Sequence, residues 1–207
     1  YSLPARIAKA VELVSLAPYD HWLLWHDLEA EREALEEAFK DRGADFRSVF
    51  GSQPDEVKEA RLIGFAHGDY RYLATKASIA GQGCNFQYHC HKAIFLGINH
   101  KFNDFIQAIH RIVRYQQLYS CDIHIIYTDA EEGIRKDLEE KWARHYELVS
   151  TMTDIIKKYG LSHAGAMGEL KRSLGVIRKE EKGEWYTAVN NDNVLELPRI
   201  VSNSVGL

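Results

Sequence analysis

Two arginines near the middle of the chain, Arg111 and Arg114, have the spacing of residues that act together. On a helix predicted from Asn103 to Arg114, each residue advances by about 100°, so Gln107 and both arginines fall within an arc of roughly 60°. Paired guanidiniums are planar, permanently charged donors that suit the charge developing in phosphoryl transfer. On spacing alone, a solvated polar helix face is the commoner explanation. The opposite, buried side is predicted from the apolar residues Phe102, Ile106, Ile109 and Val113.

A glycine-containing segment lies upstream of this helix. Gly81 and Gly83 allow a tight backbone turn that brings N–H groups close to a phosphate. A dinucleotide-binding fingerprint needs a third glycine where this chain has Phe86. Taken alone, the segment is explained as well by a glycine turn that leads into a buried stretch.

Other chemistry has less support. Four neighbouring residues are of types that bind zinc, but adjacent ligands point in different directions, whereas a zinc site needs separated pairs. They are Cys84, His89, Cys90 and His91. His110 has the chemistry of a general base, although a polar contact is the simpler role. Lys76 has the charge to approach a phosphate, although a solvated lysine after a strand explains it too.

The elements that position these residues alternate between strand-like and helix-like segments from about residue 20 to about residue 150. Parallel strands joined by helices of this size imply an α/β layered fold with helices on both faces of the sheet. Strands are predicted at 22–25, 47–50, 70–75, 93–96 and 123–127. Helices are predicted at 28–39 (capped by Asp27), 55–66 and 103–114, and residues 131–159 are predicted to form one long amphipathic helix or two.

The last part of the chain departs from this alternation. Residues 151–207 are predicted to form an extension, with a helix capped by Ser162 and a hairpin within 176–189, beside a main domain at 1–150. The chain has three cysteines, an odd number without a disulfide pattern, which favours the cytoplasm. No apolar run approaches the roughly 20 residues that span a bilayer, so no membrane partner is expected. The net charge of -4 argues against a free-standing nucleic-acid binder.

Residues 107–117 resemble motif VI of Swi/Snf-like helicases of superfamily two, whose pattern is Q-A-x-D-R-x-H-R-x-G-Q. Both arginines match, while His110, Val113 and Gln116 depart from the pattern. The resemblance implies that Arg111 and Arg114 reach the γ-phosphate of ATP held on another lobe. It also implies that Gln107 and His110 lie at the nucleotide.

Residues 78–86 resemble motif V of the same family, with the pattern S-x-x-G-x-G-x-N-L. The resemblance implies that Gly81 and Gly83 couple to the nucleotide site, and that Ser78, Asn85 and the neighbouring Lys76 contact the DNA backbone. Weaker matches in the family's order extend the resemblance over about residues 5 to 148, and several weak matches in order are jointly informative. It implies a RecA-like three-layer fold with a mainly parallel sheet and a mostly helical C-terminal extension.

The sequence contains neither the G-x-x-x-x-G-K-[ST] loop nor the D-E-x-[DH] box that hold ATP phosphates and Mg²⁺. The expected ligands, ATP and Mg²⁺, would therefore be held mainly by an N-terminal RecA-like lobe elsewhere in the same parent protein, with DNA as the other partner. A few residues are similar to large bacterial or phage proteins, which implies a linked DNA methylase domain. The alternative is a non-catalytic binding or scaffold module that kept the fold. A nucleotide- or S-adenosylmethionine-binding Rossmann domain lacks its fingerprint here.

Overall fold

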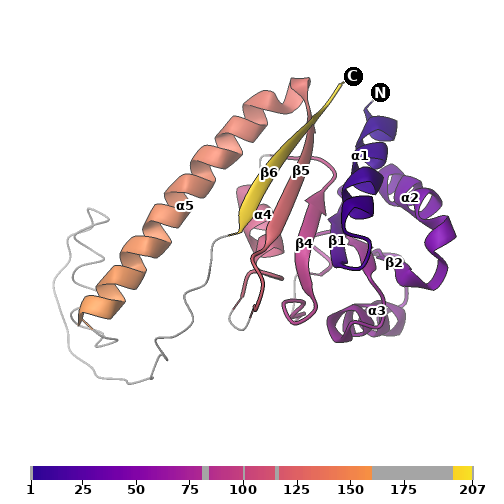
Figure 1. The fold of residues 1–207 in the computed structure, drawn as a ribbon, viewed down its shortest axis with the longest axis horizontal. Coiled ribbons are helices and arrows are strands. Elements are labelled where there is room, and N and C mark those ends of the chain that lie inside the picture. The colour runs from indigo at the N-terminus through magenta and orange to yellow at the C-terminus, as the bar shows by residue number, and fades with distance from the viewer. Residues whose placement is uncertain (1, 81–83, 100, 115–116, 160–197, 207) are drawn as a thin grey trace. The chain divides into compact units, whose positions relative to one another are not determined.

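The computed structural model describes residues 2–80, 84–99, 101–114, 117–159 and 198–206 (Figure 1). Its helices and strands alternate along the chain, as the sequence predicts for an α/β fold. In order they are α1 (Leu3–Leu16), β1 (His21–Trp25), α2 (Glu29–Ala38), the 3-10 helix η1 (Lys40–Asp45), β2 (Phe46–Val49), α3 (Asp55–His67), β3 (Tyr72–Thr75), β4 (Cys90–Phe95), α4 (Phe102–Ile109), β5 (Asp122–Thr128), the 3-10 helix η2 (Asp129–Glu131), α5 (Glu132–Tyr159) and β6 (Arg199–Val205).

The strands form one sheet in which every pairing is parallel. Within the described residues its order is β2-β3-β1-β4-β5-β6. Strand β1 is central, and its residues Trp22–Trp25 pair with Tyr72–Thr75 on one side and with Lys92–Phe95 on the other. Because parallel neighbours need a crossover, a helix or a long loop separates successive strands. The predicted α/β sheet is therefore confirmed.

Strand β1 is apolar from Trp22 to Trp25 because both faces of the sheet are covered. Side chains alternate across a strand, so Trp22 and Leu24 share one face and Leu23 and Trp25 the other. The first face packs against α1 and α2 in the main hydrophobic core. On the second face, Trp25 stacks on Phe95, which packs on Phe105 of α4 with ring centroids 4.8 Å apart.

The start of α2 differs from the prediction. Asp27 does not cap this helix; Leu28 occupies the cap position, and the Glu31 side chain from the first turn accepts hydrogen bonds from the backbone N–H of Asp27 (2.9 Å) and of Leu28 (3.0 Å). The Asp27 carboxylate instead accepts a hydrogen bond of 2.7 Å from the Asn99 amide. A carboxylate at the third helical position is an effective substitute, because it satisfies N–H groups that have no partner in the helix.

The sheet also contains a strand that the sequence analysis placed in the extension. Strand β6 pairs with β5 along its whole length, from Asp122 opposite Arg199 to Thr128 opposite Val205. Arg199 Nε donates to the Asp122 carboxylate at 2.8 Å, and Arg199 N donates to Cys121 O at 2.8 Å. One compact unit thus comprises residues 1–136 and 193–207, and a second comprises 137–192. The end of the chain belongs to the sheet rather than to an extension.

The helices outside the central sheet agree with the prediction in part. Helix α1 was not predicted, whereas the single long helix α5 agrees with the predicted segment at 131–159. The helix capped by Ser162 and the hairpin within 176–189 lie outside the described residues. Among the described helices, none is long and apolar enough to cross a membrane.

Candidate functional site

Helix α4 ends earlier than the sequence pattern predicts. The helix covers Phe102–Ile109, so Arg111 and Arg114 lie in the turns that follow it rather than on its exposed face. Arg111 N donates to Ala108 O at 3.2 Å and Ile112 N to Ile109 O at 3.1 Å, which are the i to i+3 bonds of a tightening last turn. The prediction that one helix face carries both arginines is therefore wrong.

The buried side of this segment is also shifted from the predicted set. Val113, Phe102 and Ile106 are only partly buried. The side chains that enter the core are Phe105, Ala108, Ile109 and Ile112. Burial of Ile112, at 0% exposure, holds the chain against the sheet after the helix has ended. The two arginines flanking Ile112 are thus placed by a buried neighbour.

The segment with the motif V pattern completes this turn. Arg111 O accepts a hydrogen bond of 3.0 Å from Phe86 N, and the Phe86 side chain is fully buried beside Phe65 of α3. Arg111 Nη1 donates to Cys84 O at 3.5 Å. The two segments that the sequence analysis singled out are therefore in direct contact, through main-chain and side-chain bonds.

Arg114 makes the outermost contact of this cluster. Its Nη1 donates to the Asn85 side-chain oxygen, and both side chains are exposed. The resemblance to motif V implies a role for Asn85 at the DNA backbone, whereas in this structure its amide oxygen accepts a hydrogen bond from Arg114. Asn85 therefore links the loop that precedes it to the second arginine.

The positive charge of Arg114 is close enough to influence the ionisation of Arg111. Burial lowers the pKa of Arg111 from its ordinary value, the Cys84 thiol acts in the opposite direction, and the positive charge of Arg114 lowers the pKa further. Burial also raises the pKa of the Cys84 thiol, although Arg111 opposes this. Arginine stays charged in proteins, so the pair is a site of mutual repulsion. An anion between the two would relieve that repulsion.

The other predicted residues differ in exposure, and among them only His110 has a described contact with the turn that carries the arginines. Gln107 on α4 and Ser78 after β3 are exposed, and Lys76 is partly buried. His110 is exposed, and its Nδ1 lies 3.4 Å from Val113 O, so it belongs to the same turn. Gly81 and Gly83 lie outside the described residues.

One residue that matches the end of the motif VI pattern received no role from the sequence. Gln117 makes hydrogen bonds with its backbone N–H and with both polar atoms of its side chain, all to residues around the arginine turn. The only sequence signal was its position at the end of the motif. Its structural role is visible only once the turn is known.

No known protein family and no curated protein matches the sequence. Solved structures do resemble the fold. One is the crystal structure of the C-terminal part of the Fun30 ATPase domain, with a TM-score of 0.56, 19% identity, and coverage of 63% of this chain and 44% of that one. Another is S. cerevisiae Dbp5 bound to RNA and ADP BeF3, with a TM-score of 0.55, 12% identity, and coverage of 65% of this chain and 35% of that one. The chain thus spans less than half of either structure, and its fold is a RecA-like α/β fold.

Proposed function

We propose that this chain is the second motor lobe of an ATP-dependent DNA helicase or translocase, of the Swi/Snf-like group of superfamily two. In this proposal a first RecA-like lobe holds ATP and Mg²⁺, and this chain supplies Arg111 and Arg114 to the phosphates. The RecA-like fold supports the proposal, as does the absence from the sequence of the phosphate loop and acidic box. A methylase domain linked to the same protein is part of the proposal, on the resemblance alone.

The observation that carries the proposal is the arginine pair itself. Two guanidiniums sit in one turn, held by Cys84 O and the Asn85 side chain, where each repels the other. Two neighbouring guanidiniums are suited to binding an anion such as a phosphate. A transferring γ-phosphoryl group spreads negative charge over its oxygens, and a charged donor aimed at those oxygens lowers the barrier.

The loop after β3 supplies the proposed contact with DNA. Lys76 and Ser78 follow the carboxyl end of β3, and ligands of parallel sheets bind beyond that edge. Further along the chain, Asn85 accepts a hydrogen bond from Arg114, so a DNA phosphate bound at Asn85 and an ATP phosphate bound at the arginines would act on directly bonded residues. The net charge of -4 limits the number of DNA phosphates that this chain can neutralise.

The test uses the chain joined to the first lobe and measures DNA-stimulated ATP hydrolysis. Arg114→Ala should reduce kcat by roughly three to five orders of magnitude, the range known for arginine fingers, with little change in the KM for ATP. Arg111→Ala should also be severe, but its partial burial makes a loss of folding stability possible, so Arg114 is the cleaner probe.

The matched control is Arg144→Ala on α5. Arg144 is 76% exposed and pairs only loosely with Glu140 at 3.3 Å, so its removal should leave turnover unchanged. The chain alone should hydrolyse no ATP, with or without DNA, because it lacks the phosphate loop. Unchanged turnover in a folded Arg114→Ala protein, or DNA-stimulated hydrolysis by the purified chain alone, would overturn the proposed function.

A further inference from the structure

We infer that Gln117 is a positioning residue that fixes the turn carrying Arg111 and Arg114 against the first residue of β4. This inference rests on the proposed function, because it assigns Gln117 a part in presenting those arginines to ATP. Gln117 touches no reacting group and acts through the turn.

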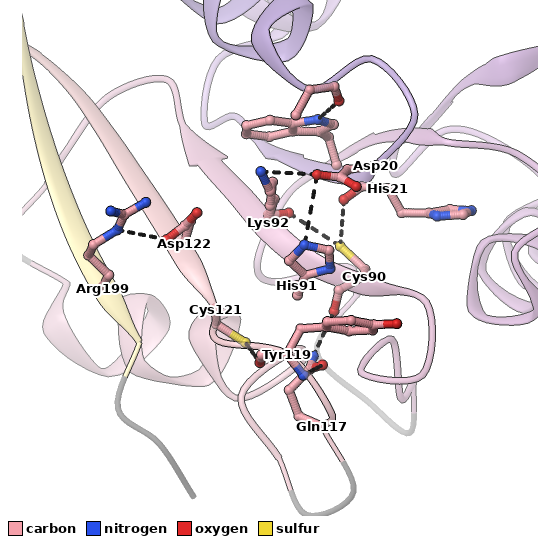
Figure 2. A network of polar contacts seen from close by, with 12 residues as sticks. Asp20, His21, Cys90, His91, Lys92, Gln117, Tyr119, Cys121, Asp122 and Arg199 are labelled. Carbon is pink, nitrogen blue, oxygen red and sulfur yellow. Dashed lines mark hydrogen bonds and ion pairs between the residues drawn. The ribbon is translucent and has the colours of Figure 1, made fainter.

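The backbone N–H and both polar side-chain atoms of Gln117 are engaged in hydrogen bonds. Its Nε2 donates to Cys90 O at 3.0 Å and to Ile112 O at 3.1 Å, while its Oε1 accepts from Tyr119 N at 3.1 Å. Its backbone N–H donates to Arg114 O at 3.1 Å. Figure 2 shows Gln117 below the start of β4, with the chain around Tyr119 beside it. One side chain therefore ties the arginine turn to the sheet.

The carbonyl groups that Gln117 satisfies explain why an amide suits this position. Ile112 O is the acceptor midway between the two arginines, and the Cys121 thiol, at 3.7 Å, is its other described side-chain donor. A glutamine carries two N–H donors on one nitrogen, so it can bond both carbonyls at once. A carboxylate in its place would repel both oxygens, and an apolar side chain would leave them without this donor.

The hydrogen bonds of Gln117 indicate how its replacement would change the positions of Arg111 and Arg114. Arg111 and Arg114 flank Ile112, so a shift of the Ile112 carbonyl rotates the backbone that carries both guanidiniums. The loop side of the turn is held independently by Phe86 N and Cys84 O. Loss of Gln117 should therefore loosen the arginines without unfolding the lobe. A misplacement of about 1 Å in a catalytic constellation costs on the order of 100-fold in rate.

A hydrogen-exchange experiment on the chain tests the structural half of the inference. In Gln117→Leu, the amides of the segment 110–121 should exchange faster, with the Tyr119 amide affected most because it loses its acceptor. The matched control is Gln53→Leu: Gln53 braces the loop after β2 in the same way, accepting from Phe50 N at 3.2 Å and donating to Ser48 O at 3.3 Å. That variant should leave segment 110–121 unchanged. Unaltered exchange there in Gln117→Leu would overturn the inference.

Kinetics of the chain joined to the first lobe test the functional half. Gln117→Leu should lower kcat by about 10- to 100-fold with the KM for ATP nearly unchanged, and Gln53→Leu should lower neither. The decisive readout is the double variant, measured by single-turnover kinetics. If Gln117 acts through the two arginines, Gln117→Leu should lower the rate less in the Arg114→Ala background than in the wild type, because only Arg111 is then left to be displaced. A merely structural role would give the full loss in both backgrounds.

The outcomes separate this inference from the proposed function. If Arg114→Ala keeps wild-type turnover, the proposed function fails and the positioning role fails with it. If Arg114→Ala loses turnover while Gln117→Leu keeps it, only the positioning role fails. A loss in Gln117→Leu that is undiminished on the Arg114→Ala background also overturns the positioning role and leaves the proposed function standing.

Discussion

Replacing Arg6 should destabilise the fold more than any exposed charge, because this residue joins three distant parts of the chain. Its Nη1 donates to Leu96 O at 2.7 Å, at the end of β4, and its Nη2 pairs with Glu131 at 2.6 Å, between β5 and α5. The Arg6 and Glu131 side chains are only 10% and 19% exposed. A hydrogen bond to a charged group contributes about 1.5–3 kcal/mol, and breaking a buried pair costs about 3–5 kcal/mol.

The lower end of that range applies to Arg6, because Glu131 keeps its bonds from the Thr128 N–H (2.8 Å) and hydroxyl (2.9 Å) when the arginine is removed. Arg6→Met retains the aliphatic stem and should cost about 3 kcal/mol. For a chain of this size that corresponds to a fall in Tm of about 6–12 °C. Urea unfolding followed by the fluorescence of the buried Trp22 and Trp25 measures the loss.

A control on the same helix isolates the buried network from the general effect of removing a charge. Lys9 pairs with Glu12 at 2.8 Å, but the two side chains are 27% and 58% exposed, so Lys9→Met should cost less than about 1 kcal/mol. If Arg6→Met lowers the free energy of unfolding no more than Lys9→Met does, the Arg6 guanidinium does not hold α1 to the sheet.

The pH dependence of the same variant gives an independent check. Burial alone would raise the pKa of Glu131, but the hydrogen bonds from Arg6 and Thr128 outweigh it and lower that pKa below the ordinary value of 4.5. A lowered carboxyl pKa contributes stability above the unfolded value, which is lost as the pH falls through the folded value. The difference in stability between wild type and Arg6→Met should therefore narrow below pH 4.5.

Three further predictions follow from the described structure. Burial lowers the pKa of four histidines: His21, His26, His91 and His124. As the pH drops below about 6.5, the unfolded chain therefore binds protons before the folded chain does, and the urea concentration at the midpoint of unfolding should fall. A midpoint concentration that stays level down to about pH 5.5 would contradict this. Val205→Asp should lower the free energy of unfolding in urea by about 3 kcal/mol or more, because Val205 is 8% exposed and lies in the main core. Ser202→Asp, on the exposed side of the same strand, should lower it little. Equal effects of the two variants would mean that β6 is not part of the sheet in solution. Binding of DNA by the chain alone should be weak, and Lys76→Ala should reduce the slope of log affinity against log salt by about one; an unchanged slope would remove Lys76 from the DNA contact.

The sequence predicts the central sheet well because its strands are unusually apolar. Strands buried on both faces appear as continuous apolar runs, as in Trp22–Trp25 and Ala93–Leu96, and helices on both faces follow from the same burial. Helix α1 was missed although its buried residues recur at helical spacing (Ile7, Ala10, Leu13 and Val14) and Pro4 stands near its start. The signal for α1 is therefore present in the local sequence.

Strand β6 could not be predicted in the same way. Val205 is the only buried residue of this strand, and its other positions are exposed or partly exposed. This is the pattern of an edge strand with little apolar signal. Its place in the sheet depends on pairing with β5, which lies 77 residues earlier in the chain at the Arg199 and Asp122 pair. Local pattern carries no information on such a distant partner.

The early end of α4 could not be predicted either, because it depends on contacts with residues distant in the sequence. These contacts also affect how the candidate site would work. No glycine or proline follows Ile109, and Ile112 and Val113 continue the apolar spacing, so local sequence favours a longer helix. The backbone leaves the helix where Phe86 N binds Arg111 O, across 25 residues, and where Gln117 binds Ile112 O. A rigid helix would hold both arginines at a fixed spacing whatever happened elsewhere. This turn is instead hydrogen-bonded to Cys84 and Asn85 on one side and to Gln117 on the other. A shift of either set of partners would therefore shift the arginines. In the proposed motor, binding of a DNA phosphate near Cys84 and Asn85 would thereby change the position of the arginines at the ATP phosphates, through a single hydrogen-bonded turn.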